Sequence, residues 1–352
     1  MLHAFDEPGD VDRVMLPINT PPGRAEARFS MHLDDLDEGE ILVMEAAPST
    51  SVLMRAQSIG AAAVVSASLH SFNIDPTGRE RHLEAIQFRT IPYGVEMPVV
   101  QISPRSYRRI EEAHAADPQA RLALDVDVEW SERPLRTLVA AIVGSDRPDE
   151  AVVTVSHVQE PGAGDNATGV AGLLESARLM VDLLEKGRME WPSRTLVFIW
   201  GDEFRQTQAW LDDTERTPIV GLSSDMTGQS REKTGAIALL ERMPDPGAVR
   251  PLAPDVHTPW GKNEVDASKL VPNGLAVIAR CALADVAAFS EGWNTAEHPW
   301  EGCSDHDEFI ARAVPAVLFW HFTDFAYHTS LDRLDHVDPV ELQRTAVALL
   351  ST

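Results

Sequence analysis

The side chains that could do chemistry in this sequence are histidines and carboxylates at or just beyond the ends of strand-like runs. They are His157, Asp165, Glu203, Asp225 and His328. Imidazole and carboxylate groups are ligands for divalent cations, and zinc in particular binds both. Two histidines and three carboxylates are enough for two zinc ions if one carboxylate bridges them. The sequence therefore predicts a metal site that can hold two zinc ions.

The segment 156–169, SHVQEPGAGDNATG, carries the first two of these side chains. Residues 152–155 form a β-branched run typical of a buried parallel strand, and residues 169–185 have the apolar spacing of a helix. Asp165 stands where this helix begins, so the positive end of the helix keeps its carboxylate ionised. Open α/β sheets bind ligands in crevices at such strand ends. Taken alone, the segment is equally compatible with a polar loop in which Asp165 only caps the helix.

The other three side chains also follow strand-like runs. Glu203 follows residues 195–200, Asp225 follows residues 219–224, and His328 lies beyond residues 316–320. The order of the motifs, H…GAGDNATG…GDE…SDM…SDH…YHT, resembles the co-catalytic di-zinc aminopeptidase family. That family also includes glutamate carboxypeptidases and, more distantly, glutaminyl cyclases. The resemblance runs from about residue 136 to the end of the sequence and is looser before it.

The resemblance implies a role for each predicted ligand. His157 and Asp225 would be the terminal ligands of one zinc ion. Glu203 and His328 would be those of the other ion, and Asp165 would bridge the two. A bridged pair of zinc ions lowers the pKa of a shared water and polarises a carbonyl oxygen. The expected reaction is therefore hydrolysis of a peptide bond by a metal-bridged hydroxide.

Two positions depart from the family pattern. The family has a glutamate as general base immediately before its glutamate ligand, and here that position is Asp202, one methylene shorter. We expect Asp202 to be the base, with Glu160 in the ligand loop as the alternative. If Asp202 is not catalytic, it caps a helix or supports the metal ligands. Gln159 replaces an aspartate that would support the first histidine ligand, and a neutral amide would raise the basicity of the imidazole less.

Further residues lie near these motifs. Ser304, Asp305 and His306 are expected to support the site without taking part in catalysis. The side chain of Tyr327 either presents its hydroxyl to the site or only packs against its neighbours. Asn166 begins a glycosylation sequon, which a loop pressed against metal would make inaccessible to a glycan.

The connection 226–273 has little periodicity and many proline, glycine and charged residues. Loops of this length are usually functional or disordered. Because the connection directly follows a predicted ligand, we expect it to shape the substrate pocket. The candidates within it are Arg242, His257 and Trp260, although ordinary loop packing is the favoured interpretation of each one taken alone.

The composition excludes several classes of function. The 352 residues carry 55 acidic and 30 basic side chains, a formal net charge of −25, which argues against binding to nucleic acid or to an anionic membrane. Two cysteines, Cys281 and Cys303, allow one bridge but no disulfide-rich scaffold. No apolar run approaches the roughly 18 residues of a membrane span, and the N-terminus lacks a signal-peptide core. We expect a soluble chain, cytoplasmic, or exported if a longer N-terminus precedes it.

The pattern of elements predicts two domains. Residues 1–132 read as a small α/β unit whose strands GEILVMEA, GAAAVVSAS and MPVVQIS resemble a protease-associated domain. Its histidines, His70 and His82, are expected in a solvated loop or, alternatively, in a lid. Residues 133–352 alternate strands and helices, which predicts an α/β fold with a mostly parallel mixed sheet sandwiched by helices.

These observations predict a zinc-dependent exopeptidase acting on peptide substrates, with two zinc ions per chain, and an aminopeptidase in particular. A carboxypeptidase or an amidohydrolase is the alternative, because the metal ligands do not determine specificity. A cyclotransferase fits less well with a two-domain chain. The departures at Asp202 and Gln159 leave open a non-catalytic receptor or scaffold.

Overall fold

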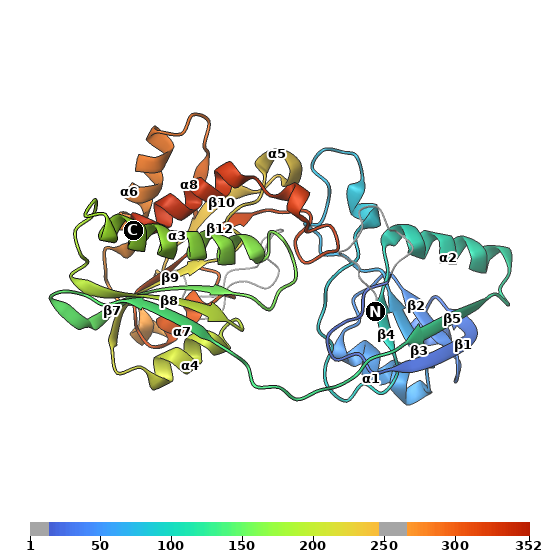
Figure 1. Ribbon diagram of the computed structural model, residues 1–352. Coiled ribbons are helices and arrows are strands. Elements are labelled where there is room, and N and C mark those ends of the chain that lie inside the picture. The colour runs from blue at the N-terminus through green and yellow to red at the C-terminus, as the bar shows by residue number, and fades with distance from the viewer. Residues whose placement is uncertain (1–13, 246–265) are drawn as a thin grey trace. The chain divides into compact units, whose positions relative to one another are not determined.

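The computed structural model describes residues 14–245 and 266–352 (Figure 1). The chain forms two compact units, which divide between Arg133 and Pro134. The segment Phe325–Arg333 packs as part of the smaller, N-terminal unit. The predicted boundary between residues 132 and 133 lies beside this division, whereas the assignment of Phe325–Arg333 has no counterpart in the sequence analysis.

The smaller unit contains a five-stranded sheet in the order β4-β3-β2-β1-β5. The strands are β1 (Gly23–Ser30), β2 (Ile41–Met44), β3 (Ala63–Ser66), β4 (Val99–Gln101) and β5 (Arg121–Val126), and the helices are α1 (Thr50–Ile59) and α2 (Pro104–Ala116). Only β5 runs antiparallel to its neighbour. Along β2, Ile41 and Val43 join one apolar cluster while Leu42 and Met44 join another. This sheet is buried on both faces, which accounts for its continuous apolar strands.

Loop 69–89 of the smaller unit holds the segment Phe325–Arg333 through hydrogen bonds. The buried Asn73 donates from Nδ2 to the carbonyl oxygens of Phe325 (2.8 Å) and Tyr327 (2.9 Å). The carbonyl oxygen of His328 accepts from the backbone N–H of Phe88 and from Nε2 of Gln87, both at 2.6 Å. The late segment is therefore built into the N-terminal unit.

The histidines of this loop differ from the expectation of solvated side chains. His70 is half-buried, and its ring stacks on Phe72 with 5.1 Å between centroids. Burial, together with the charges of Arg89 and His328, lowers the pKa of His70 to about 4. Nδ1 of His82 accepts a hydrogen bond from the backbone N–H of Asp75.

The larger unit contains a seven-stranded sheet in the order β11-β10-β12-β9-β7-β8-β6. The strands are β6 (Leu138–Ile142), β7 (Arg147–His157), β8 (Arg194–Gly201), β9 (Thr217–Ser224), β10 (Ile237–Glu241), β11 (Thr295–His298) and β12 (Ala316–Phe322). The four central strands β12, β9, β7 and β8 are parallel, whereas β6 and β10 run antiparallel to β8 and β12. The predicted mixed, mostly parallel sheet is confirmed.

Helices cover both faces of this sheet (Figure 1). They are α3 (Ala167–Glu185), α4 (Arg205–Asp213), α5 (Arg231–Thr234), α6 (Leu275–Ala288), α7 (His306–Ala311) and α8 (Pro339–Leu350). Figure 1 shows α3, α6 and α8 on one side and α4 and α7 on the other. A Cβ added to Gly221 in β9 would lie 2.5 Å from the ring of Phe309 in α7, so this glycine permits the close approach of helix and sheet.

The structure bears on three further expectations. The connection 226–273 is not without regular structure, because it contains α5 and the buried strand β10; its residues 246–265, with His257 and Trp260, lie outside the described part of the chain. Cys281 and Cys303 are both exposed, and no disulfide bridge joins them. Among the described helices, none combines the length and the apolar character needed to cross a membrane.

Candidate metal centre

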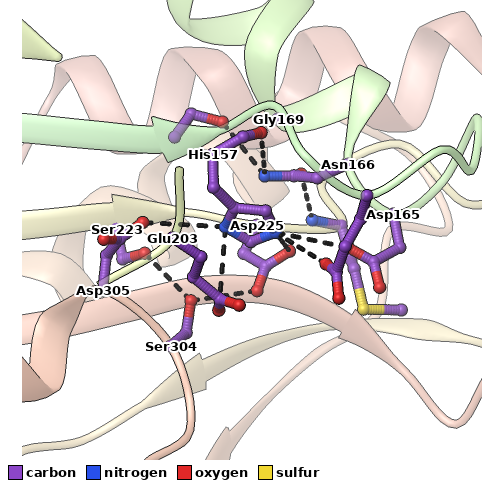
Figure 2. A network of polar contacts seen from close by, with 12 residues as sticks. His157, Asp165, Asn166, Gly169, Glu203, Ser223, Asp225, Ser304 and Asp305 are labelled. Atoms are coloured by element: carbon purple, nitrogen blue, oxygen red, sulfur yellow. Dashed lines mark hydrogen bonds and ion pairs between the residues drawn. The ribbon is translucent and has the colours of Figure 1, made fainter. Parts of the chain in front are cut away.

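The imidazole of His157 lies fully buried at the carboxyl end of β7, surrounded by carboxylates (Figure 2). Its Nε2 lies 2.9 Å from Glu160, 3.4 Å from Asp165 and 3.6 Å from Asp225. Its Nδ1 lies 3.7 Å from Glu203 and 3.6 Å from Asp305. Four of the five predicted ligands, His157, Asp165, Glu203 and Asp225, are therefore brought together.

The register of three parallel strands explains this convergence. His157 pairs with Gly201 of β8, and Val155 pairs with Ser223 of β9. Glu203 follows β8 by two residues, and Asp225 follows β9 directly. Because the carboxyl ends of parallel strands meet at the same edge of a sheet, residues distant in sequence become neighbours there.

Asn166 fixes the loop that carries Asp165. Its Nδ2 donates to Oγ of Ser156 and to the carbonyl oxygen of His157, both at 3.2 Å, and its Oδ1 accepts from the backbone N–H of Met226 at 2.9 Å. Asn166 is fully buried, in agreement with the expectation that its sequon is inaccessible. Sequence reasoning missed this structural role, and the only available signal was its place beside a predicted ligand.

Ser304 and Asp305 support the cluster, as expected. Oγ of Ser304 donates to Oδ2 of Asp225 at 3.0 Å. The carboxylate of Asp305 accepts from the backbone N–H of Phe204 (2.9 Å) and from the side chains of Gln206 (2.8 Å) and Thr207 (2.7 Å). Asp305 thus stabilises the turn that directly follows Glu203.

Gln159 contacts a different partner from the one predicted. Its Nε2 donates to Oε2 of Glu203 at 3.3 Å, and its Oε1 accepts from the backbone N–H of Glu203 at 3.0 Å. The amide therefore orients the glutamate, whereas the sequence suggested a hydrogen bond to the imidazole of His157.

The two candidate bases lie in different surroundings. Oε2 of Glu160 is the carboxylate oxygen nearest to His157 in the cluster. The side chain of Asp202 is partly exposed and lies 3.7 Å from the guanidinium of Arg205. The assignment of the general base, to Asp202 or alternatively to Glu160, stays a prediction.

His328 lies in the segment that packs with the smaller unit. Its ring stacks on that of Tyr327 at 3.8 Å between centroids and meets Phe88 edge-on at 5.9 Å. The tyrosine therefore packs against the histidine. Participation of His328 in the metal site stays a prediction.

Burial and charge shift the protonation of the cluster. Burial alone would lower the pKa of His157, but the carboxylates of Asp225 and Glu203 outweigh burial and hold this pKa well above its usual value. Burial raises the pKa of Glu203 well above its usual range and also raises that of Asp225, and the charge of His157 opposes both shifts. Protons are therefore retained where carboxylates crowd together.

The donor set suits a divalent cation in place of those protons. Potential ligand atoms lie within 4.8 Å of one another in the group His157, Glu160 and Asp165 and in the group His157, Glu203 and Asp225. Among the described residues, neither Nδ1 of His157 nor Oδ1 of Asp225 has a hydrogen-bond partner, although both atoms are buried. Such orphaned atoms, each with a free lone pair once deprotonated, are what a metal ion would satisfy.

Comparison with known proteins relates the chain to a peptidase family. Residues 137–204 and 275–352 match the model of peptidase family M28, and these segments include every predicted ligand except Asp225. No curated protein matches the sequence.

Several solved structures share the fold. A zinc aminopeptidase from Bacillus subtilis is similar with a TM-score of 0.63 and 16% identity, over 96% of this chain and 77% of that one. An aminopeptidase from Aneurinibacillus sp. strain AM-1 is similar with a TM-score of 0.52 and 19% identity, over 96% and 76%. A peptidase M28 precursor from Shewanella amazonensis is similar with a TM-score of 0.57 and 18% identity, over 96% and 76%.

We predict that zinc stabilises the protein more at pH 8 than at pH 6. The raised pKa values of His157, Glu203 and Asp225 mean that the metal-free folded state binds more protons than the unfolded state. The contribution of His157 is complete below about pH 6.5 and is lost as pH rises through its folded pKa, while that of the carboxylates begins to fall above about pH 4. Zinc replaces these protons, so its binding strengthens as pH rises.

The measurement is the midpoint of thermal unfolding at both pH values, with and without zinc. The metal-free midpoint should fall from pH 6 to pH 8, and the increase caused by zinc should grow. His157→Gln, the comparison variant, should remove the part of both trends that comes from the imidazole. If zinc raises the unfolding midpoint less at pH 8 than at pH 6, this electrostatic account is contradicted.

Proposed function

On the premise that its larger unit is a peptidase domain of family M28, we propose that this protein is a zinc-dependent exopeptidase, specifically an aminopeptidase. The observation that carries the proposal is the cluster of one buried imidazole and several carboxylates at the ends of β7, β8 and β9. The family match covers the strands β7 and β8 that present His157 and Glu203.

The charge of the site supports cleavage from the amino end of a peptide. Five carboxylates, those of Glu160, Asp165, Glu203, Asp225 and Asp305, lie within 3.7 Å of the ring nitrogens of His157. Two zinc ions would bring four positive charges against five negative ones, because a ligating imidazole is neutral. The remaining negative charge attracts the α-ammonium group of a substrate and repels a C-terminal carboxylate.

The proposed ligand assignment follows the family pattern. His157 and Asp225 would hold one ion, Glu203 and His328 would hold the other, and Asp165 would serve both. When bound, a zinc pair supplies a water with a pKa near neutrality and a polarised substrate carbonyl. Ser304, Gln159 and Asn166 orient ligands through the hydrogen bonds described above, which lowers the cost of gathering like charges.

A carboxylate must take the proton of the attacking water and deliver it to the departing amine. We propose Asp202 for this step because it occupies the position of the family's base. Glu160 is the second candidate, supported by its place against His157.

The smaller unit is proposed to be a protease-associated domain. Its sheet of parallel strands with one antiparallel edge fits the strand pattern that suggested the resemblance. Substrate preference is proposed to depend on the connection 226–273, in which Arg242 follows β10 and lies 3.7 Å from Asp245 and from Glu297.

The ligand assignment predicts distinct zinc contents. After resupply of zinc, elemental analysis should give about two equivalents for the wild-type chain. Asp165→Ala should disturb both ions, because only Asp165 serves two, and His328→Ala should remove one. Asp182→Ala, which replaces a partly exposed aspartate of α3 paired with Lys186, is the control and should keep both. Two retained ions in His328→Ala would exclude this histidine as a ligand.

The aminopeptidase proposal is tested with blocked peptides. Single residues should be released from the amino end of short peptides, a chelator should abolish the release, and zinc should restore it. N-acetylation of the substrate should block cleavage, and C-terminal amidation should not. The reverse pattern would identify a carboxypeptidase, and no turnover by zinc-loaded protein across a broad peptide library would point to a receptor or scaffold.

The base assignment predicts a loss of turnover without a loss of metal. Asp202→Asn should lower kcat by at least about 10²-fold at unchanged zinc content, as expected when a general base is removed. Asp202→Glu should retain or raise activity because it restores the longer reach. Arg205→Ala removes the ion pair but keeps the carboxylate, so it serves as the control. A nearly active Asp202→Asn beside an inactive, zinc-loaded Glu160→Gln would move the base to Glu160.

A further inference from the structure

A buried carboxylate outside the metal cluster organises the chain that leads into it. Glu241, the last residue of β10, is 1% exposed. Its Oε1 accepts hydrogen bonds from the backbone N–H groups of Glu301 (2.9 Å) and Gly302 (2.8 Å) and from Nε2 of His306 (2.9 Å). One buried oxygen thus fixes both ends of the segment 301–306.

The residues that flank this segment also hold it in place. Asp307 accepts the backbone N–H of Cys303 at 2.7 Å and the indole N–H of Trp300 at 3.1 Å. Gly302 has a φ of +79°, and a Cβ at this position would lie 2.6 Å from Oδ2 of Asp307. This turn is therefore compact and requires glycine.

The segment held in this way delivers two side chains to the metal cluster (Figure 2). Ser304 donates to Asp225, and Asp305 accepts from the backbone N–H of Phe204, immediately after Glu203. Both contacts depend on where residues 301–306 lie. Glu241 joins this segment to β10 through three hydrogen bonds, and a longer contact of 3.5 Å between Oγ of Ser304 and Oγ of Ser223 joins it to β9.

We propose that Glu241 is a positioning residue of the metal centre, which acts by holding Ser304 against Asp225 and Asp305 against the turn that follows Glu203. The proposal rests on the proposed function, because it assumes that the cluster binds zinc. Side chains that orient metal ligands from outside commonly change metal affinity or activity by about 10- to 100-fold when replaced.

A carboxylate suits this position better than its near analogues. Glu241 can accept three hydrogen bonds at one oxygen and can also balance a protonated His306. Glutamine keeps the acceptor oxygen but loses the charge, whereas aspartate keeps the charge but is one methylene too short. Alanine removes both features and leaves two backbone N–H groups without their acceptor.

The experiment measures zinc dissociation constants by chelator competition on the full chain, together with thermal unfolding of each metal-free variant. Glu241→Ala should weaken zinc binding by about 10- to 100-fold, and Glu241→Gln by less, while the variant remains folded. Ser304→Ala should also weaken binding. The double variant Glu241→Ala/Ser304→Ala should lose less affinity than the two single losses combined, because both act through one segment.

Glu150→Gln is the matched control. Glu150 pairs with Arg194 at 2.6 Å near the start of β7, seven residues and roughly 23 Å along the strand from His157. Its loss should leave zinc affinity within about twofold of the wild type even if thermal stability falls.

The outcomes separate this proposal from the function on which it rests. A wild-type chain that binds no zinc would overturn the proposed function. A wild-type chain that binds two ions, beside folded Glu241→Ala and Glu241→Gln with unchanged affinity, would overturn the positioning role alone. A third zinc equivalent that disappears in Glu241→Gln would also overturn it, by making Glu241 a ligand itself.

Discussion

The burial of one imidazole among carboxylates governs the organisation of the larger unit. His157 has no exposed surface, and five carboxylates approach its two ring nitrogens. Carboxylates gathered around one imidazole in a poorly hydrated interior repel one another, so they need protons or a cation to remain together. The raised pKa values of His157, Glu203 and Asp225 indicate that protons stabilise the metal-free cluster. The set of nitrogen and oxygen donors indicates that a divalent metal ion can take their place.

Supporting side chains then hold each carboxylate in place. Gln159 orients Glu203, Ser304 orients Asp225, and Asn166 fixes the loop beside Asp165. Asp305 lies against His157 and also binds the turn that follows Glu203, whereas Glu241 lies further out and binds the backbone of the segment 301–306. The metal centre is therefore the inner part of a larger polar network whose outer members are backbone amides.

The sequence predicts those features that depend on local pattern. His157 ends an apolar strand, and Glu203 and Asp225 each follow one. Parallel strands bring such positions to one edge of a sheet, so their convergence could be predicted without coordinates. The sequence did not predict β10, because this strand has only five residues and lies in a stretch rich in charged residues, proline and glycine. The roles of Asn166 and Glu241 could not be predicted from the sequence, since each depends on hydrogen-bond partners that are brought near only when the chain folds.

The assignment of Phe325–Arg333 to the N-terminal unit has a consequence for how the chain can be divided. The polypeptide passes between the two units three times, at residues 133 and 134, at 324 and 325, and at 333 and 334. A single proteolytic cut in the exposed stretch 131–137 would therefore leave the residues before the cut joined to the rest of the chain only by noncovalent contacts, such as those with Phe325–Arg333. A fragment ending at Arg133 would also lack both carbonyl acceptors of Nδ2 of the buried Asn73 and the nearer acceptor of Nε2 of Gln87, so the N-terminal unit is not an autonomous module that can be excised at one point.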